Sequence, residues 1–459
     1  MTELEESIIT AKDYSKQVND LIDRYSIDHQ PIEVSFRDLV PELNKPDRAT
    51  HLIHTYPAKL LMHIPHFFLN NSVLSKEGDT IMDPFCGSGT VMLEALLALR
   101  HGIGADANPL ARLITRVKVH KYKAEDLRSY ANAIIENINR NEINIGVPNV
   151  INVDYWFLPE IQKQLTSIFN TINNIIDEKI KEFFLVCFSN CVKKVSLADQ
   201  RVSVPVRLNP ERYNYSHPLY LESKRKLENL VDIKVIDKFL EIVNDNIARF
   251  QNSADLFDNE YVASVVSDDA RKLTEKIGSE DLIKDDVVSL IICSPPYAGA
   301  QKYIRASSLN LGWLDLVKNA DTLKELDGLN IGRENYKKSD YDVFRPTDIT
   351  QADILLEKIF EINPLRAHIA GNYLKEMKTA LTEAVRVLKP DGYFVLVVGN
   401  NQVCGLEFET QEYLRHILEG LGLTIVLRLI DDIQSYGLMT KRNKTANVIT
   451  REWVLILKK

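Results

Sequence analysis

Apolar residues recur along this chain at two spacings that alternate for most of its length. Short apolar runs bounded by turn residues predict β-strands at 80–82, 102–106, 261–266, 287–293, 393–398, 423–429 and 452–457. Helical spacing predicts helices between them, among them 91–99, 352–362 and 369–388. This alternation is typical of an α/β fold with a doubly wound, mostly parallel sheet, which binds ligands at the carboxyl ends of its strands.

The alternation is interrupted once, between about 120 and 260. Long helical patterns take its place, at 125–140, 159–177, 178–195 and 222–252. We therefore expect an inserted, mainly helical domain at 121–258, between two halves of the sheet domain at 51–120 and 259–459. Residues 1–50 carry an amphipathic pattern at 3–25 and are expected to form an N-terminal helical extension.

The first predicted strand runs into the glycine-containing turn Asp83-Pro-Phe-Cys-Gly-Ser-Gly-Thr90, and a helix follows. Gly87 and Gly89 permit backbone angles closed to other residues and let a ligand approach the main chain. The start of the helix adds unpaired N–H groups. The Gly-Lys-Ser/Thr ending of a P-loop and the last glycine of a dinucleotide fingerprint are both missing. The turn therefore predicts a site for some other cofactor that carries a nucleoside.

Asp106 ends the second predicted strand. It lies about 20 residues beyond the first strand, where nucleotide-binding folds place a carboxylate that holds ribose hydroxyls. The alternative is an ordinary helix cap before Asn108-Pro109. The nearby glycine turn favours the ligand-binding interpretation.

A second motif, Ser294-Pro-Pro-Tyr297, follows a strongly apolar strand. Its two prolines stiffen the chain and remove two backbone donors. The carbonyls and the Ser294 hydroxyl therefore form an acceptor-rich edge beside the flat Tyr297 ring. Such an edge suits a planar ring that carries an exocyclic amino group, whereas the alternative is a proline-rich turn that caps a core strand.

Composition narrows the class of protein. The 459 residues are 45% hydrophobic and 26% charged, as in globular proteins of two or three domains. No apolar run is long enough for a membrane span, and the acidic N-terminus lacks the apolar segment of a secretory signal, so we expect a cytoplasmic protein. The five scattered cysteines fit core positions in a reducing compartment better than a metal site at Cys187 and Cys191.

The formal net charge of −8 does not favour a general polyanion-binding protein, so binding to nucleic acid would need local clusters of cations. Cationic residues are clustered in two segments. One is the middle of the helical domain, where they are mixed with aromatic residues, and the other is the segment before the last strand. Their candidates for contacts to phosphates and bases are Lys194, Arg201, Arg207, Arg212, Tyr213, Lys441, Arg442 and Lys444. A solvated surface loop is the alternative for the first segment.

The motifs resemble those of the amino-methylating DNA methyltransferases that use S-adenosylmethionine. The turn at 83–90 resembles the family's cofactor motif, and 294–297 resembles its catalytic motif in the form associated with cytosine N4 methylation. Adenine N6 enzymes more often carry Asp or Asn at the first position of that motif. His54-Thr-Tyr-Pro-Ala-Lys59 and Asp268-Asp-Ala-Arg271 are similar to supporting motifs. The resemblance covers about 50–120 and 260–459.

The resemblance implies a Rossmann-like methyltransferase fold that binds S-adenosylmethionine and no metal ion. It implies that the turn holds the methionine moiety, that Asp106 holds the ribose, and that Asp269 accepts from the adenine amino group. Lys59 would lie near the methionine carboxylate. The cofactor-binding residues are then Tyr56, Lys59, Asp83, Pro84, Phe85, Cys86, Gly87, Ser88, Gly89, Thr90, Asp106, Ala107, Asp269 and Ala270, and the catalytic residues are Ser294, Pro295, Pro296 and Tyr297.

By the same resemblance, the helical insert reads a specific sequence in double-stranded DNA, and the methyl group goes to the exocyclic N4 of cytosine. A restriction–modification or related defence system is the implied setting, with a cognate restriction endonuclease as an optional partner and the oligomeric state open. The alternatives are N6-adenine methylation of DNA, base methylation of RNA, and a nucleic-acid-binding protein that has lost catalysis. Cys293 is interpreted as a core residue rather than a covalent nucleophile.

Overall fold

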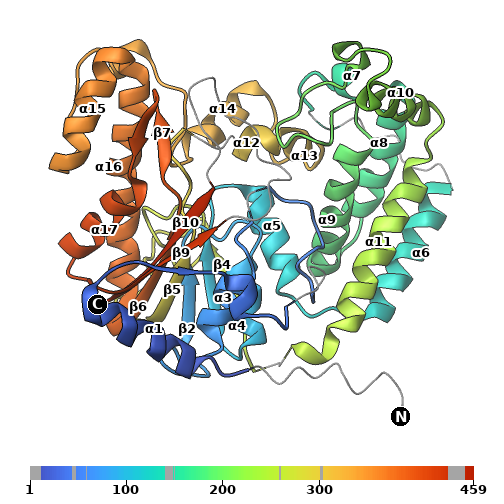
Figure 1. The fold of residues 1–459 in the computed structure, drawn as a ribbon. Coiled ribbons are helices and arrows are strands. Elements are labelled where there is room, and N and C mark those ends of the chain that lie inside the picture. Colours follow the sequence, from blue (N-terminus) through green and yellow to red (C-terminus); the bar gives the residue numbers. More distant parts are fainter. Residues whose placement is uncertain are drawn as a thin grey trace.

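A computed structural model of the chain describes residues 12–43, 48–57, 59–139, 148, 150–257, 260–299, 303–432 and 450–459. In this part of the chain an eight-stranded sheet lies between layers of helices, and a helical bundle stands beside it (Figure 1). None of the described helices is long and apolar enough to cross a membrane.

The sheet has the strand order β1-β9-β10-β6-β5-β2-β3-β4. In the described part of this sheet, β10 is antiparallel to its neighbours β6 and β9, and the other pairs are parallel. The expected mostly parallel α/β sheet is confirmed. The strands are β1 (Ile32–Val34), β2 (Thr80–Asp83), β3 (His101–Ala105), β4 (Ala263–Ser267), β5 (Val288–Cys293), β6 (Leu388–Val398), β9 (Thr424–Asp432) and β10 (Arg451–Lys458), with β7 (Asn401–Val403) and β8 (Leu406–Phe408) in a separate pair.

The order of the strands reverses between β2 and β5. The chain proceeds from β2 outward to β3 and β4 on one side, and from β5 to β6 on the other. Met82 of β2 lies opposite Ile291 of β5 in a parallel pair, so the two strands end at the same edge. A parallel sheet binds ligands in the crevice outside the carboxyl ends at such a reversal. The glycine turn and Ser294-Pro-Pro-Tyr297 therefore start side by side.

Side chains that alternate along the strands give the sheet two apolar faces. Ile81, Leu290 and Val395 belong to the core on one face, with helices α1, α3 and α4. Their neighbours Met82 and Ile291 belong to the core on the other, with α15, α16 and α17. The bounds are α1 (Ser15–Asp28), α2 (Phe36–Leu39), α3 (His63–Leu69), α4 (Thr90–Leu97), α15 (Thr350–Ile362), α16 (Pro364–Val387) and α17 (Thr410–Gly420).

The N-terminal segment differs from its expectation at the edge of the sheet. A helical extension is expected over residues 1–50, but β1 within it adds a strand to the sheet edge, parallel to β9. The next helix after α2 is α3, which begins at His63, and residues 54–57 before it have an irregular conformation.

The middle of the chain is mainly helical, as expected, although the pattern at 222–252 forms two helices. Pro218 begins the first, where the His217 side chain accepts from the Leu219 N–H at 3.1 Å, and the second begins at Val235. The elements are α6 (Ala124–Asn139), α7 (Val153–Trp156), α8 (Pro159–Asn173), α9 (Glu178–Lys194), η1 (Pro210–Arg212), α10 (Pro218–Val231), α11 (Val235–Asn252) and η2 (Ala254–Leu256).

The apolar core of the helical bundle continues past the expected domain boundaries. It takes in Ile114 and Val117 of α5 and the fully buried Trp313 of α13. Both belong to segments that the sequence assigns to the sheet domain, but they pack into the core of the bundle, which is separate from the two apolar cores on the faces of the sheet. These segments are α5 (Pro109–Lys118), α12 (Tyr303–Ala306), α13 (Ser308–Trp313) and α14 (Ala320–Gly328), and η3 (Lys338–Asp340) follows.

A buried carboxylate anchors the segment that carries Tyr56. Glu94 of α4 is fully buried and contacts Arg48, His51 Nε2 at 2.7 Å and His66 Nδ1 at 2.9 Å. Burial alone would raise the pKa of Glu94, but Arg48 and the two imidazoles lower it well below its ordinary value. Because an unpaired buried charge would be costly, this cluster fixes residues 48–51 against α4.

Candidate active site

A cavity lies at the carboxyl ends of β2, β3, β4 and β5, and we call it the sheet-edge cavity. Residues that follow each of the four strands line it, and residues from other segments complete the lining. The lining consists of Tyr56, Pro84, Phe85, Gly87, Asp106, Ala107, Asp269, Ala270, Ser294, Pro296, Tyr303, Leu329, Asn330 and Ile331. Most of these residues were predicted from the sequence.

Asp106 holds the glycine turn in place. One carboxylate oxygen accepts from the Gly87 N–H at 2.9 Å, and the other accepts from the Asn108 N–H at 2.8 Å. The cap of α5 is Asn108, whose side chain accepts from the Leu110 N–H at 3.0 Å. Asp106 is therefore not the helix cap that the alternative interpretation required. Burial raises the pKa of its carboxyl group.

The turn itself has little room. Gly89 has a φ of 78°, and a Cβ atom there would lie 2.7 Å from the Thr115 side chain of α5. Thr115 Oγ1 also donates to the Gly87 carbonyl at 3.0 Å. The backbone N–H groups of the turn are thereby fixed beside the cavity. Cys86, Ser88, Gly89 and Thr90 support the turn without lining the cavity, and the Ser88 hydroxyl is buried without a partner among the described residues.

Asp83 stands behind the turn and does not line the cavity. It accepts from the Phe85 N–H at 3.0 Å and is only 4% exposed. Burial, reinforced by the negative charge of Asp106, raises the pKa of Asp83 to about 8. Two neighbouring carboxyl groups therefore make this end of the cavity favourable for a cation.

Tyr56 and Lys59 come from one motif but lie in different places. The Tyr56 hydroxyl accepts from Asn108 Nδ2 at 3.1 Å, and its ring lies beside Gly87. Lys59 Nζ turns away and donates to the carbonyls of His51 and His54 at 3.2 and 2.7 Å. Lys59 does not line the cavity, and burial lowers its pKa to about 8. Its expected role near a carboxylate ligand stays a prediction.

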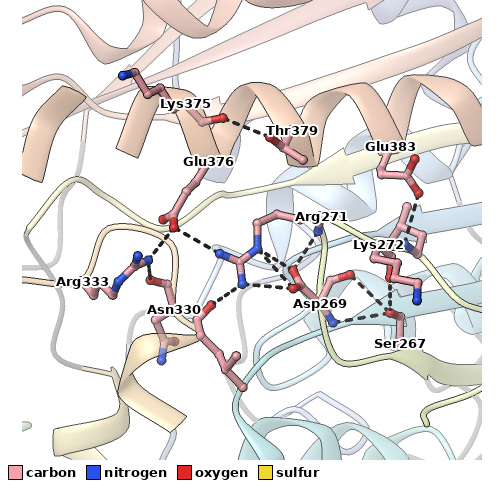
Figure 2. Close-up of polar contacts among 12 residues, drawn as sticks. Ser267, Asp269, Arg271, Lys272, Asn330, Arg333, Lys375, Glu376, Thr379 and Glu383 are labelled. Carbon is pink, nitrogen blue, oxygen red and sulfur yellow. Dashed lines mark hydrogen bonds and ion pairs between the residues drawn. The ribbon is translucent and has the colours of Figure 1, made fainter. Parts of the chain in front are cut away.

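Asp269 faces the cavity from the end of β4 while an arginine holds it from behind (Figure 2). Arg271 donates through Nε to Oδ1 at 2.9 Å and through Nη2 to Oδ2 at 3.0 Å. The Asp269 side chain remains 36% exposed, so its carboxylate can still accept from a ligand. The sequence singled out Asp269 and gave no role to Arg271.

The Ser294-Pro-Pro-Tyr297 motif enters the cavity through Ser294 and Pro296, whereas Pro295 and Tyr297 do not line it. The backbone of Tyr297 lies against Gly332, where a Cβ atom would come within 2.5 Å of the Tyr297 carbonyl oxygen. Cys293, one residue earlier, is fully buried in the core with α16, and burial raises its thiol pKa well above the ordinary value. This placement agrees with the interpretation of Cys293 as a core residue.

Two further cavities continue from the first. An interdomain cavity shares Tyr303 and Asn330 with the sheet-edge cavity and is also lined by Asn152, Trp156 and Arg333. An arginine cavity shares Trp156 and Arg305 with the interdomain cavity. It is lined by Tyr155, Trp156, Pro205, Val206, Arg207, Leu208, Asn209, Arg212 and Arg305. The three cavities thus connect the strand ends to the helical domain.

The predicted nucleic-acid-binding residues separate into groups. Arg207 and Arg212 line the arginine cavity, and Lys194, Arg201 and Tyr213 do not. Arg201 is paired with Asp199 at 2.9 and 2.8 Å, and Tyr213 stacks on His217. Lys441, Arg442 and Lys444 lie outside the described residues.

Sequence reasoning missed several residues that line the cavities. Tyr303, Leu329, Asn330 and Ile331 come from segments without a recognisable motif. Trp156 and Arg305 join the two outer cavities. Gly332 was the one residue of this segment that the sequence offered as a signal, because glycine allows the backbone to approach another segment closely. No group of three or more His, Cys, Asp and Glu side chains able to hold a metal ion occurs in the part of the chain that the structure describes.

Comparison with known proteins agrees with these motifs. A family model described as DNA methylase, N6_N4_Mtase, matches residues 19–115. The type II methyltransferase M.MvaI of Kocuria varians is 23% identical over 432 residues, which cover 89% of this chain and 91% of that protein. The type II methyltransferase M.MjaII of Methanocaldococcus jannaschii is 21% identical over 57% of this chain and 62% of that protein.

A third relative, the type II methyltransferase M.BsoBI of Geobacillus stearothermophilus, is 24% identical over 52% of this chain and 48% of that protein. Among solved structures, the rRNA methyltransferase aviRa from Streptomyces viridochromogenes aligns over 93% of this chain and 96% of its own, with 9% identity and a TM-score of 0.31. The strand order and pairing of the sheet define the fold.

Proposed function

We propose that this chain, which belongs to the N6-adenine/N4-cytosine DNA methylase family, transfers a methyl group from S-adenosylmethionine to the exocyclic N4 of cytosine in double-stranded DNA. One observation carries the proposal: Asp106, Asp269 and the Ser294-Pro-Pro turn, from three different strand ends, converge on a single cavity. The type II methyltransferase relatives support a restriction–modification setting. A cognate restriction endonuclease is a proposed partner.

The sheet-edge cavity fits S-adenosylmethionine in its chemistry. Asp106 offers acceptors for ribose hydroxyls, and Asp269 offers one for an exocyclic amino group. Tyr56, Phe85 and Ile331 provide flat and apolar surface for the adenine ring. The positive charges of the sulfonium and ammonium groups would favour the ionised forms of Asp83 and Asp106, which burial otherwise disfavours.

When bound, S-adenosylmethionine supplies a methyl group that is already activated on sulfur, so the chain mainly has to orient the acceptor nitrogen. Ser294 and the Pro295 carbonyl accept from the cytosine amino group and direct its lone pair toward the methyl carbon. The same acceptors stabilise the positive charge that develops on this nitrogen. Tyr297 stacks on a base rotated out of the duplex. No cysteine nucleophile takes part, because Cys293 is buried in the core.

The identity of the modified nucleoside tests the proposal. We expect N4-methylcytosine when duplex DNA is incubated with labelled S-adenosylmethionine and digested for mass spectrometry. Structured RNA serves as the parallel substrate. N6-methyladenine in the DNA would replace the cytosine assignment with the adenine alternative. Label in RNA alone would overturn the proposal of a DNA methyltransferase.

Two substitutions separate catalysis from cofactor binding. Ser294→Ala removes one acceptor, so we expect kcat to fall by about 10²-fold with the cofactor Kd nearly unchanged. Asp106→Ala removes the acceptor that also holds Gly87, so we expect the cofactor Kd to rise by at least about tenfold. Single-turnover kinetics and isothermal titration calorimetry measure the two effects. The assignment of both residues is wrong if neither variant differs from the wild type.

The pKa of Asp83, raised to about 8 by burial and by Asp106, predicts a pH dependence of cofactor affinity. A bound cation favours the ionised carboxylate and lowers this pKa, so binding releases a proton below pH 8. Affinity should therefore increase as pH rises through the window below about 8 and then level off. The cofactor's own amino group titrates in the same pH range. The relevant quantity is therefore the difference in cofactor binding free energy between wild type and Asp83→Asn at each pH. A pH-independent difference would contradict the role of Asp83.

The arginine cavity predicts the position of phosphate contacts. Among the described residues, no carboxylate lies within ion-pair distance of Arg207, Arg212 or Arg305. Replacing any one by Ala should lower the slope of log K for DNA against log salt by about 0.9, the value for one phosphate. Arg201→Ala is the matched control, because Asp199 already neutralises that charge. Equal effects at Arg201 and Arg212 in filter-binding titrations would contradict this assignment.

A further inference from the structure

Arg271 joins three parts of the molecule that meet beside the sheet-edge cavity (Figure 2). It grips both carboxylate oxygens of Asp269, donates through Nη2 to the Leu329 carbonyl at 3.0 Å, and reaches Glu376 Oε1 of α16 at 3.2 Å. Its side chain is only 19% exposed. Since a guanidinium holds its donors in one rigid plane, the positions of Asp269 and Leu329 are fixed relative to each other.

Glu376 carries the connection one step further. Its Oε1 atom also accepts from Arg333 Nη1 at 2.5 Å, while its buried Oε2 atom has no partner among the described residues. Arg271 and Arg333 therefore meet at one oxygen. Together they hold residues 329–333, which we call the bridging loop, at both ends. Arg271 binds the carbonyl of its first residue, Leu329, and the side chain of its last residue, Arg333, binds Glu376.

The bridging loop contacts the two cavities of the proposed site and the catalytic motif. Leu329, Asn330 and Ile331 line the sheet-edge cavity, and Asn330 and Arg333 line the interdomain cavity. The Gly332 carbonyl accepts from the Gly299 N–H at 3.0 Å, two residues beyond Tyr297. Gly332 has a φ of 82°, and a side chain there would collide with the Tyr297 carbonyl. The loop thus packs on the backbone of the catalytic motif.

We propose that Arg271 is a positioning residue that links the cofactor site to the target site, so that cofactor and target DNA bind with positive coupling. This inference rests on the proposed function. An adenine ring held by Asp269 contacts Leu329 and Ile331, while a target nucleotide in the interdomain cavity contacts Asn330 and Arg333. Arg271 ties the Asp269 carboxylate to the Leu329 carbonyl, so a ligand that positions Asp269 also positions the loop that the other ligand contacts.

Arg271 makes this coupling depend on the adenine end of the cofactor. Without its guanidinium, Asp269 can still accept from the adenine amino group, but its position no longer fixes Leu329 and Glu376. The loop would then keep its direct contacts with each ligand and lose the rigid connection between them. The structure thus separates binding, which involves Asp269, from coupling, which involves Arg271.

The experiment measures the Kd of a duplex, first mapped as a substrate by sequencing methylated plasmid DNA, with and without saturating S-adenosylhomocysteine. We expect wild-type coupling of about 5- to 150-fold, the usual range for linked sites, and less than about twofold in Arg271→Ala. The cofactor Kd with and without DNA must change by the same factor. Arg271→Lys keeps the charge but not the planar contact and should restore coupling only in part.

The matched control is Arg386→Ala. Arg386 lies near the end of α16, is 22% exposed, and pairs with Glu383 of the same helix and with Asp285, away from all three cavities. It should keep wild-type coupling, which would exclude a general effect of losing an arginine that is paired with an acidic residue of this helix. Arg333→Ala breaks the same connection at the bridging loop, and we expect it to lose coupling as well. It provides the test if Arg271→Ala is too unstable to titrate.

The possible outcomes distinguish the two proposals. Full coupling in both Arg271→Ala and Arg333→Ala, with both ligands bound, overturns the positioning role and leaves the methyltransferase assignment intact. Wild-type protein that binds both ligands and methylates DNA without any coupling also overturns the inference alone. Wild-type protein that binds neither ligand overturns the proposed function and the inference with it.

Discussion

The site depends on the adjacency of β2 and β5 in a parallel sheet. Parallel strands end at a common edge, and the reversal of strand order between these two leaves a crevice there. Whatever residues follow the strands must therefore share that crevice. This places the turn after Asp83 beside the turn after Cys293, although the helices α4 to α11 lie between them in sequence. The other functional residues are arranged around this pair of turns.

A second constraint comes from the segment before the sheet, which fastens the helical bundle to the site. Glu94 holds its first residues through Arg48 and His51. Further along, the Ile53 carbonyl accepts from Asn246 Nδ2 of α11 at 3.0 Å, and Thr55 Oγ1 donates to Asn190 Oδ1 of α9 at 3.0 Å. Tyr56 follows directly and enters the cavity. The bundle is thereby fixed relative to the sheet-edge cavity by buried and partly buried hydrogen bonds.

The sequence predicted those parts of the fold that local patterns determine. Apolar runs identified the central strands, and the residues after them line one cavity because strand ends share one edge. The bridging loop could not be found in this way, since Leu329 to Arg333 are placed by contacts with Arg271, Tyr297 and Gly299. Tertiary packing also determines the direction of the Lys59 side chain, which a motif cannot encode. For the same reason, the sequence did not show that α5 and α13 pack into the core of the bundle.

The distribution of perturbed carboxyl groups fits a reaction that needs acceptors and no strong base. Asp83 and Asp106, whose pKa values are raised by burial, lie around the glycine turn and not at Ser294. Ionising two buried carboxyl groups near each other opposes folding above their ordinary pKa values, because the folded state disfavours the charge. A cationic ligand favours the ionised form of both carboxyl groups, so its binding is linked to their deprotonation. Under the proposed function, the Ser294-Pro-Pro turn then has only to orient the target amino group, through proline carbonyls and a hydroxyl.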